Sequence, residues 1–179
     1  MTDISILDLH TQRLVRPKIE TVLPFFLDDT RLNAALDFIK YLRTNKMSPA
    51  WAGIHNAWKA MNKGKPICYI RLGGEWIRET KNVQWVVMPY LNHMHQYENM
   101  ITDEGLQDIV WDDLHYCRGC AYNCPPLSKT ILGKNFDNLC HAQFYNGRFP
   151  VSFVNPDEVA YNQIKKLLEI EREARYTER

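Results

Sequence analysis

The spacing of hydrophobic residues predicts an amphipathic helix in the first third of the chain. In residues 30–45, apolar side chains recur every three or four positions, which places them on one face of a helix. Thr30 is the expected N-cap of this helix, because its hydroxyl oxygen can accept from a backbone N–H group of the first turn. The apolar stripe consists of Leu32, Ala35, Leu36, Ile39 and Leu42.

The same helical period returns at the end of the chain, in residues 156–175. Asn155 is the expected cap, Pro156 suits the first turn, and Glu158 would complete a capping box. Beyond Leu168 the residues are mostly charged, so we expect this end of the helix to project into water. The buried stripe consists of Ala160, Ile164, Leu167 and Leu168.

Between the two helices the pattern becomes typical of β-strands. Residues 55–61 and 66–72 flank a turn in which Gly64 supplies the unusual backbone angle of a hairpin. Residues 76–80 and 83–90 suggest a second hairpin. The strand at 83–90 is apolar on both faces, so we expect it to lie inside the sheet.

Strands that cluster between flanking helices indicate an α+β fold. We expect a mainly antiparallel sheet of about four to five strands, with residues 149–154 supplying one of them, and a Cys-rich metal-binding loop region. Residues 1–29 contain Pro17 and Pro24, which argue against one long helix, so we expect an N-terminal arm that is irregular or forms a short strand against the core. Residues 30–179 are expected to form a single α+β domain.

Four of the five cysteines fall within residues 115–141, in the segment HYCRGCAYNCPPLSKTILGKNFDNLCH. Cys117 and Cys120 form a CxxC pair, which lets two thiolates reach one ion from a single turn. Cys124 follows closely and can supply a third ligand. Cys140 returns after a stretch whose length is common between the halves of zinc sites. We therefore predict a metal site with Cys117, Cys120, Cys124 and Cys140 as ligands.

Zinc is the expected metal, and an iron–sulfur cluster is the alternative cofactor. CxxCxxxCP matches the end of a ferredoxin motif, but the further upstream cysteine of that motif is missing. Reduced or redox-active thiols are the remaining interpretation. His115 and His141 flank the site and could bind the metal, orient a ligand, or be ordinary polar residues. Cys68, in a predicted strand, is interpreted as a core residue.

The cysteine segment also resembles a family of small, uncharacterised bacterial proteins. The resemblance spans about residues 35–170 and is most specific in the cysteine block. It implies a shared architecture and a shared cysteine set, but no reaction. The matching parts are Trp58-Lys59, Gly64-Lys65, Cys68-Tyr69-Ile70, CxxCxxxC at 117–124, Thr130-Ile131-Leu132-Gly133-Lys134, Phe136-Asp137-Asn138, Cys140-His141 and Asn155-Pro156-Asp157-Glu158.

Composition narrows the class of protein. The chain has 179 residues, of which 45% are hydrophobic and 24% charged, as in ordinary globular proteins. The net charge of +1 and the absence of a basic block weigh against a nucleic-acid partner. No apolar run approaches the roughly 18 residues of a membrane helix, and the first residues do not resemble a secretory signal. A cytoplasmic protein with no membrane partner is expected.

Two further groups of residues could carry function. The strand region is rich in aromatic residues that could line a ligand pocket, although filling the core or covering the sheet is the favoured interpretation. They are Trp51, Trp58, Tyr69, Trp76, Trp85 and Tyr90. His93 and His95, with Asp103 and Glu104 nearby, could form a second metal or acid–base site. Exposure of both histidines to solvent is the favoured interpretation there.

These patterns favour a metal-stapled binding module for a small ligand or a protein partner. The alternatives are a metalloenzyme, in which three cysteines hold zinc and a histidine assists a bound water, and an iron–sulfur or redox protein. The residue pattern does not decide whether the protein is an enzyme, because no known catalytic motif is present.

Overall fold

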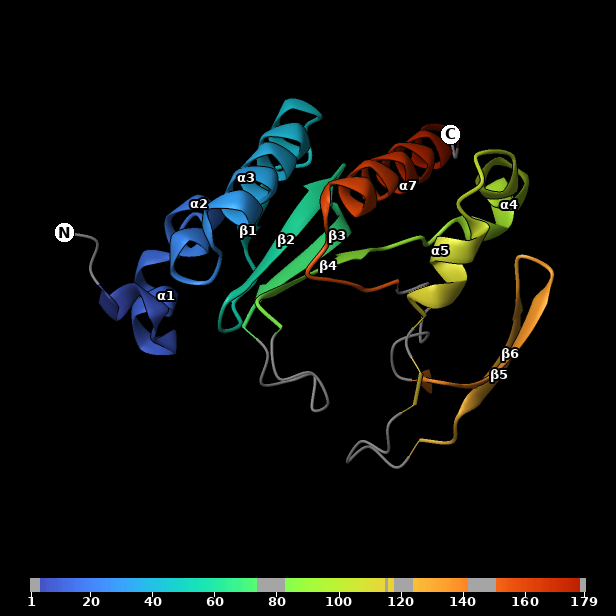
Figure 1. Cartoon of the computed structure of the whole chain (residues 1–179), viewed down its shortest axis with the longest axis horizontal. Helices are drawn as coiled ribbons and strands as arrows, with labels where there is room; N and C mark the ends of the chain where they lie inside the picture. The colour runs from blue at the N-terminus through green and yellow to red at the C-terminus, as the bar shows by residue number, and fades with distance from the viewer. Residues whose placement is uncertain (1–3, 74–82, 115, 118–123, 142–150, 178–179) are drawn as a thin grey trace. The chain divides into compact units, whose positions relative to one another are not determined.

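The computed structural model describes residues 4–73, 83–114, 116–117, 124–141 and 151–177 (Figure 1). The chain divides into two compact units. The first unit comprises Met1–Val87 and Phe153–Asn162, and the second comprises Met88–Ser152 and Gln163–Arg179. The predicted α+β class is confirmed, with a five-stranded sheet and a separate two-stranded sheet among the described residues.

The five-stranded sheet has the strand order β1-β2-β3-β4-β7. β1 pairs with β2, β2 with β3, and β4 with β7, each time in antiparallel orientation, as predicted. All five residues of β4 are buried and the strand lies between β3 and β7, which confirms its interior position. The strands are β1 (Pro49–Trp51), β2 (Ala57–Asn62), β3 (Lys65–Leu72), β4 (Trp85–Pro89) and β7 (Phe153–Val154).

The predicted hairpin β2–β3 is also confirmed. Asn62 pairs with Lys65, and the two turn residues Lys63 and Gly64 have φ values of 49° and 75°. Positive φ at both positions is the geometry of a type I′ turn, whose twist matches that of the strands. The other predicted strand of this region, residues 76–80, lies outside the described residues.

α3 (Asp29–Thr44) corresponds to the first predicted helix, and its predicted cap is wrong. The N-cap is Asp28, whose Oδ1 accepts from the backbone N–H of Arg31 at 3.1 Å. Aspartate at this position adds a favourable interaction with the helix dipole to the hydrogen bond. The buried face of α3 consists of Ala35, Phe38, Ile39 and Leu42.

The core of the first unit is centred on the indole of Trp85, which is fully buried. Phe38 of α3 meets this ring edge-on at 6.5 Å between centroids, and Tyr161 lies 5.6 Å from it. Phe38 and Tyr161 also contact each other at 5.4 Å. Aromatic rings at such distances and angles pack favourably. Trp58 is likewise fully buried, so the core interpretation is confirmed for Trp58 and Trp85.

The N-terminal segment, expected to be irregular or to form a short strand, consists of short helices. Pro17 separates α1 from α2, in agreement with the prediction that prolines exclude one long helix. The side chain of Gln12 is fully buried and ties α1 to the turn before β2, since its Oε1 accepts from the backbone N–H of Asn56 at 2.9 Å. The elements are η1 (Ile4–Leu7), α1 (Leu9–Val15), α2 (Ile19–Val22) and η2 (Leu23–Phe25).

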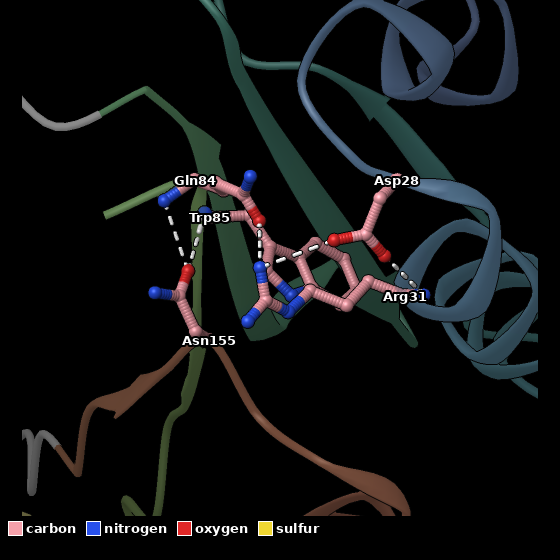
Figure 2. A network of polar contacts seen from close by, with 5 residues as sticks. All are labelled: Asp28, Arg31, Gln84, Trp85 and Asn155. Atoms are coloured by element: carbon pink, nitrogen blue, oxygen red, sulfur yellow. Dashed lines mark hydrogen bonds and ion pairs between the residues drawn. The ribbon is translucent and has the colours of Figure 1, made fainter. Parts of the chain in front are cut away.

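Asn155 fixes the end of β7 instead of capping the last helix (Figure 2). Its Oδ1 accepts from the backbone N–H groups of Gln84 and Trp85 at 2.9 and 3.2 Å. Gln84 in turn accepts from Arg31, which also pairs with Asp28. The helix α7 (Glu158–Thr177) instead begins after Asp157, whose Oδ1 accepts from the N–H of Ala160 at 2.8 Å.

The second unit contains a hairpin that the hydrophobic pattern does not predict. β5 (Leu127–Ile131) and β6 (Lys134–Leu139) pair antiparallel through a turn at Leu132 and Gly133, with φ values of 47° and 78°. The stretch expected to be a metal-binding loop between Cys124 and Cys140 is therefore largely a β-hairpin. The same unit contains α4 (Met94–Asp103), α5 (Gln107–Asp112) and the longer part of α7.

None of the helices in the described ranges combines the length and the apolar character that crossing a membrane requires.

Candidate functional site

The cysteine segment begins beside β6. Tyr116 forms a β-bridge with Leu139, the last residue of β6. One residue further, the backbone N–H of Cys117 donates to the carbonyl oxygen of Asn138 at 2.6 Å. The Asn138 side chain donates back to the carbonyl oxygen of Cys117 at 3.3 Å. Cys117 is thereby held against β6 by its backbone, and its thiol takes no part in these bonds.

The same residue, Leu139, also pairs with Leu127 at the start of β5. Since β5 occupies one side of β6, the bridge to Tyr116 must occupy the other. Cys140 directly follows Leu139, and Cys124 precedes Leu127 by three residues. The strand register therefore brings the segments that carry Cys117, Cys124 and Cys140 to the same end of the β5–β6 hairpin.

The predicted four-cysteine set is only partly described. Cys120 and His115 lie outside the described residues, and His141 is half-buried directly after Cys140. No three His, Cys, Asp or Glu side chains among the described residues form a group that could hold a metal ion, and Cys117, Cys124 and Cys140 are among the residues covered. The finer prediction of a Cys-rich metal-binding loop thus has no support from the described side chains alone.

The described cysteines differ in burial. Cys117, Cys124 and Cys140 are half-buried thiols that are not joined in disulfides. Cys68 is fully buried in β3, which confirms its interpretation as a core residue. Thiolates are ligands that zinc prefers, and of the described cysteines the three near the end of the hairpin are reached by solvent, whereas Cys68 is not.

A second polar cluster, which the sequence pattern missed, surrounds the fully buried carboxylate of Glu171 on α7. Its Oε1 accepts from Nδ1 of His93 and from Nε of Arg175, both at 2.7 Å. Its Oε2 accepts from the hydroxyl of Tyr97 at 2.6 Å and from the backbone N–H of His93 at 3.2 Å. A buried carboxylate needs such compensation, because an unpaired charge there is very costly. We call these four residues the Glu171 cluster.

The Glu171 cluster coincides with a distortion of α4. Tyr97 has φ −137° and ψ 25°, which are not helical values, so α4 is kinked at the residue that bonds Glu171. Burial raises the pKa of the Tyr97 hydroxyl far above its usual value, and the adjacent Glu171 carboxylate raises it further. The phenol therefore stays protonated and serves only as a hydrogen-bond donor to the carboxylate.

Two predictions about this region are wrong. His93 was expected to be exposed and is buried, although His95 is exposed as predicted. The part of α7 beyond Leu168 was expected to project into water, yet Glu171 and Arg175 are buried there. The sequence signal that was available is spacing, because Glu171 lies three and four residues after the buried Leu168 and Leu167.

The possible metal or acid–base site of His93 and His95 with Asp103 and Glu104 does not form between His93 and Glu104, because each has another partner. Glu104 pairs with Lys166 at 2.7 Å, and both side chains are about half exposed. His93 is bonded to Glu171 instead. The Glu171 cluster is thus a carboxylate saturated by donors, an arrangement that fixes two helices together and orients the imidazole of His93.

One further acid lies between α5 and the cysteine segment. Burial raises the pKa of Asp113 to about 6, and the neighbouring Asp112 contributes to the increase. The carbonyl oxygen of Asp113 accepts from the N–H of Ser152 at 2.9 Å, beside the bridge between Leu114 and Val151. The ionised form of Asp113 therefore destabilises the folded second unit at neutral pH.

Comparison of the chain with protein-family models, with curated proteins and with solved structures gave no match.

Proposed function

We propose that the second unit is a metal-binding module in which Cys117, Cys120, Cys124 and Cys140 hold a structural zinc ion. The observation that supports the proposal is the pairing of Leu139 on both sides, with Tyr116 and with Leu127. This register brings the segments that carry Cys117, Cys124 and Cys140 to one end of the hairpin. Four thiolates would complete a closed tetrahedral site of the structural kind.

The exposure of the hairpin supports a structural role for the metal. Ser128, Lys129 and Thr130 in the middle of β5 are all exposed. An isolated two-stranded hairpin is marginally stable in water, so it needs anchoring at its ends. Zinc bound by thiolates from both sides of β6 would supply that anchor, since metal binding and local folding are coupled.

The proposal also includes the class of molecule that the module binds. We propose a small ligand or a protein, as the absence of a basic block disfavours nucleic acid. The aromatic residues that could have lined a pocket give no support, because Trp58 and Trp85 are fully buried in the core of the first unit.

Elemental analysis of the full chain, purified without added metal, tests the proposal. We expect a stoichiometric amount of zinc, strong loss of zinc and a lower melting temperature in Cys117→Ser and Cys140→Ser, and full zinc content in the control Cys68→Ser. Cys68→Ser corrects for the general effect of replacing a cysteine. Iron in place of zinc would favour the iron–sulfur alternative. Zinc content and melting temperature unchanged in both ligand variants would reject the proposal.

A further inference from the structure

We propose that this chain associates with a second copy of itself, through a basic and apolar surface on α1 of one copy and an acidic surface on α4 of the other. The first surface consists of Arg13, Leu14, Val15, Arg16 and Lys18, and we call it the α1 surface. The inference goes beyond the proposed function, because it involves no cysteine and does not depend on a metal ion.

The α1 surface exposes two consecutive apolar side chains. Leu14 is 72% exposed and Val15 is 57% exposed, and Leu14 is the most exposed large apolar side chain among the described residues. Gln12 in the same helix is fully buried, so α1 packs against its own unit and still leaves both apolar side chains to solvent. Scattered single apolar residues are ordinary on a protein surface, whereas adjacent ones surrounded by charge indicate a contact surface.

The charges around these two residues are positive. Residues 9–19 contain three Lys or Arg and no Asp or Glu, and all three basic residues are exposed. The nearest acids on either side are engaged within the chain, because Asp8 caps α1 and Glu20 pairs with Arg43 at 2.7 Å. None of the three basic side chains forms an ion pair with an acid in the described part of the chain. A partner of this surface should therefore be acidic and expose an apolar side chain.

The chain itself contains a surface of this kind on α4. Residues 88–117 include six Asp or Glu and no Lys or Arg. In α4, Met100 is 44% exposed, and Asp103 lies beside it because it follows three residues later in the helix. Glu104 is paired with a lysine of α7, but Glu98 and Asp103 are exposed and form no ion pair with a described residue. Methionine adapts readily to different apolar neighbours, so Met100 suits a contact with Leu14 and Val15.

The distribution of charge along the chain favours a second copy as the partner. The net charge is only +1, yet residues 1–73 contain eleven Lys or Arg against six Asp or Glu, in contrast to the acidic residues 88–117. Because the two contact surfaces differ, each copy in a dimer keeps one surface unused, and larger assemblies should form as the concentration rises. Few apolar side chains take part, so the association should be weak and sensitive to salt.

Sedimentation velocity of the full chain over a range of protein concentrations tests the proposal. At an ionic strength of about 0.05 M we expect the average mass to rise with concentration above the 21.1 kDa of one chain. At about 0.5 M the mass should stay close to that of one chain, because salt screens the opposite charges of the two surfaces.

Two charge-reversed variants test which surfaces meet. Arg13→Glu combined with Arg16→Glu removes the basic surface, and Glu98→Lys combined with Asp103→Lys removes the acidic one. Each double variant alone should remain monomeric at low salt. An equimolar mixture of the two should form dimers and nothing larger, because only one intact basic surface and one intact acidic surface remain in each pair.

Lys40→Glu combined with Lys46→Glu is the matched control, because it changes the net charge as much as the reversal on α1 does. It should associate like the wild type. Leu14→Ser keeps every charge and should weaken the association, and melting temperatures establish that each variant is folded. A wild-type protein that stays at 21.1 kDa at every concentration overturns the inference. Association that persists in both charge-reversed variants, or a mixture of the two that stays monomeric, also overturns it.

Discussion

The hairpins β2–β3 and β5–β6 have turns of the same geometry but differ in how deeply their strands are buried. β2–β3 turns through Lys63 and Gly64, and β5–β6 through Leu132 and Gly133, with positive φ at all four residues. β3 is buried from Ile67 to Ile70, whereas β5 is exposed from Ser128 to Thr130. The first hairpin is therefore stabilised by the hydrophobic core, and the second must depend on a few specific contacts.

The comparison teaches that polar and aromatic contacts contribute more to the β5–β6 hairpin than to β2–β3, and our proposal adds zinc–thiolate bonds to them. The indole N–H of Trp111 donates to the carbonyl oxygen of Ile131 at 2.9 Å, and Lys134 Nζ lies 4.8 Å from the Trp111 ring centroid. Glu171 binds α7 to α4 through charged and hydrogen-bonded groups. Changes at such sites should act on the second unit far more than on the first.

The largest effect is expected from Glu171→Gln, which removes the charge and keeps the shape of the side chain. Arg175 would remain buried without its counter-ion, and Tyr97 would lose part of its acceptor. We expect the free energy of unfolding to fall by about 3–5 kcal/mol, measured by urea denaturation, with faster hydrogen exchange in α4 and α7.

Glu104→Gln is the matched control. The pairs Glu171–Arg175 and Glu104–Lys166 both have N–O distances of 2.7 Å, but the side chains of the first are 0% and 3% exposed and those of the second 51% and 52%. The exposed pair should contribute less than about 1 kcal/mol. Equal losses in the two variants would contradict the importance of burial.

Trp111→Phe should come next in size. The variant keeps an aromatic ring but loses the hydrogen bond to Ile131 and weakens the contact with Lys134. We expect a loss of about 1–2 kcal/mol, seen as faster amide exchange in β5 and β6. Trp51→Phe is the control, because it removes a hydrogen bond from an indole N–H to Gln12 in the first unit. It should leave amide exchange in β5 and β6 unchanged. Similar exchange in the two variants would remove the proposed role of Trp111.

Asp113→Asn should stabilise the protein in a pH-dependent manner. The pKa of Asp113 is raised from 3.8 to about 6 by burial and by Asp112, so the folded protein binds this proton more tightly than the unfolded chain. Stability from this group is present below about pH 4 and lost as the pH rises through about 6. Discounted for partial exposure, the variant should gain about 1 kcal/mol at pH 8.

Urea unfolding of wild type and Asp113→Asn at pH 4 and pH 8 measures this difference. At pH 4 the two proteins should be nearly equally stable, because Asp113 is neutral there in the folded wild type. A gain of the same size at both pH values would show that the carboxylate charge is not the cause.

The smallest effect is expected from Leu132→Asn. Leucine is disfavoured at φ 47°, whereas asparagine is preferred at the first position of a type I′ turn. The variant should stabilise the β5–β6 hairpin by about 0.5 kcal/mol, seen as slower amide exchange. Leu132→Val should have the opposite effect, since a β-branched side chain fits positive φ even less well. A destabilising Leu132→Asn would mean that leucine packing outweighs turn geometry.

The parts of the fold that the sequence predicts are those with a strong hydrophobic period. α3, the β2–β3 hairpin and the interior strand β4 belong to this group, because their apolar side chains form the core around Trp85. The short helices at the N-terminus were missed because their start signal is local. Asp8 caps α1 by accepting from the N–H of Thr11 at 2.9 Å, a contact that polar side chains can make in many loops.

The candidate site was harder to predict because it depends on contacts between distant residues. The cysteine spacing suggests a metal, but no local pattern tells that Tyr116 pairs with Leu139. β5–β6 is mainly polar, so only the Leu132-Gly133 turn could have revealed it. Glu171 resembled a surface residue by charge, and only its place in the apolar stripe of α7 contradicted that interpretation.

X-ray absorption at the zinc edge of the protein, purified without added metal, tests the central claim most directly. Our account predicts four sulfur ligands at about 2.3 Å, the distance typical of thiolate-bound zinc. A first shell dominated by nitrogen or oxygen, or a protein without zinc, would contradict it.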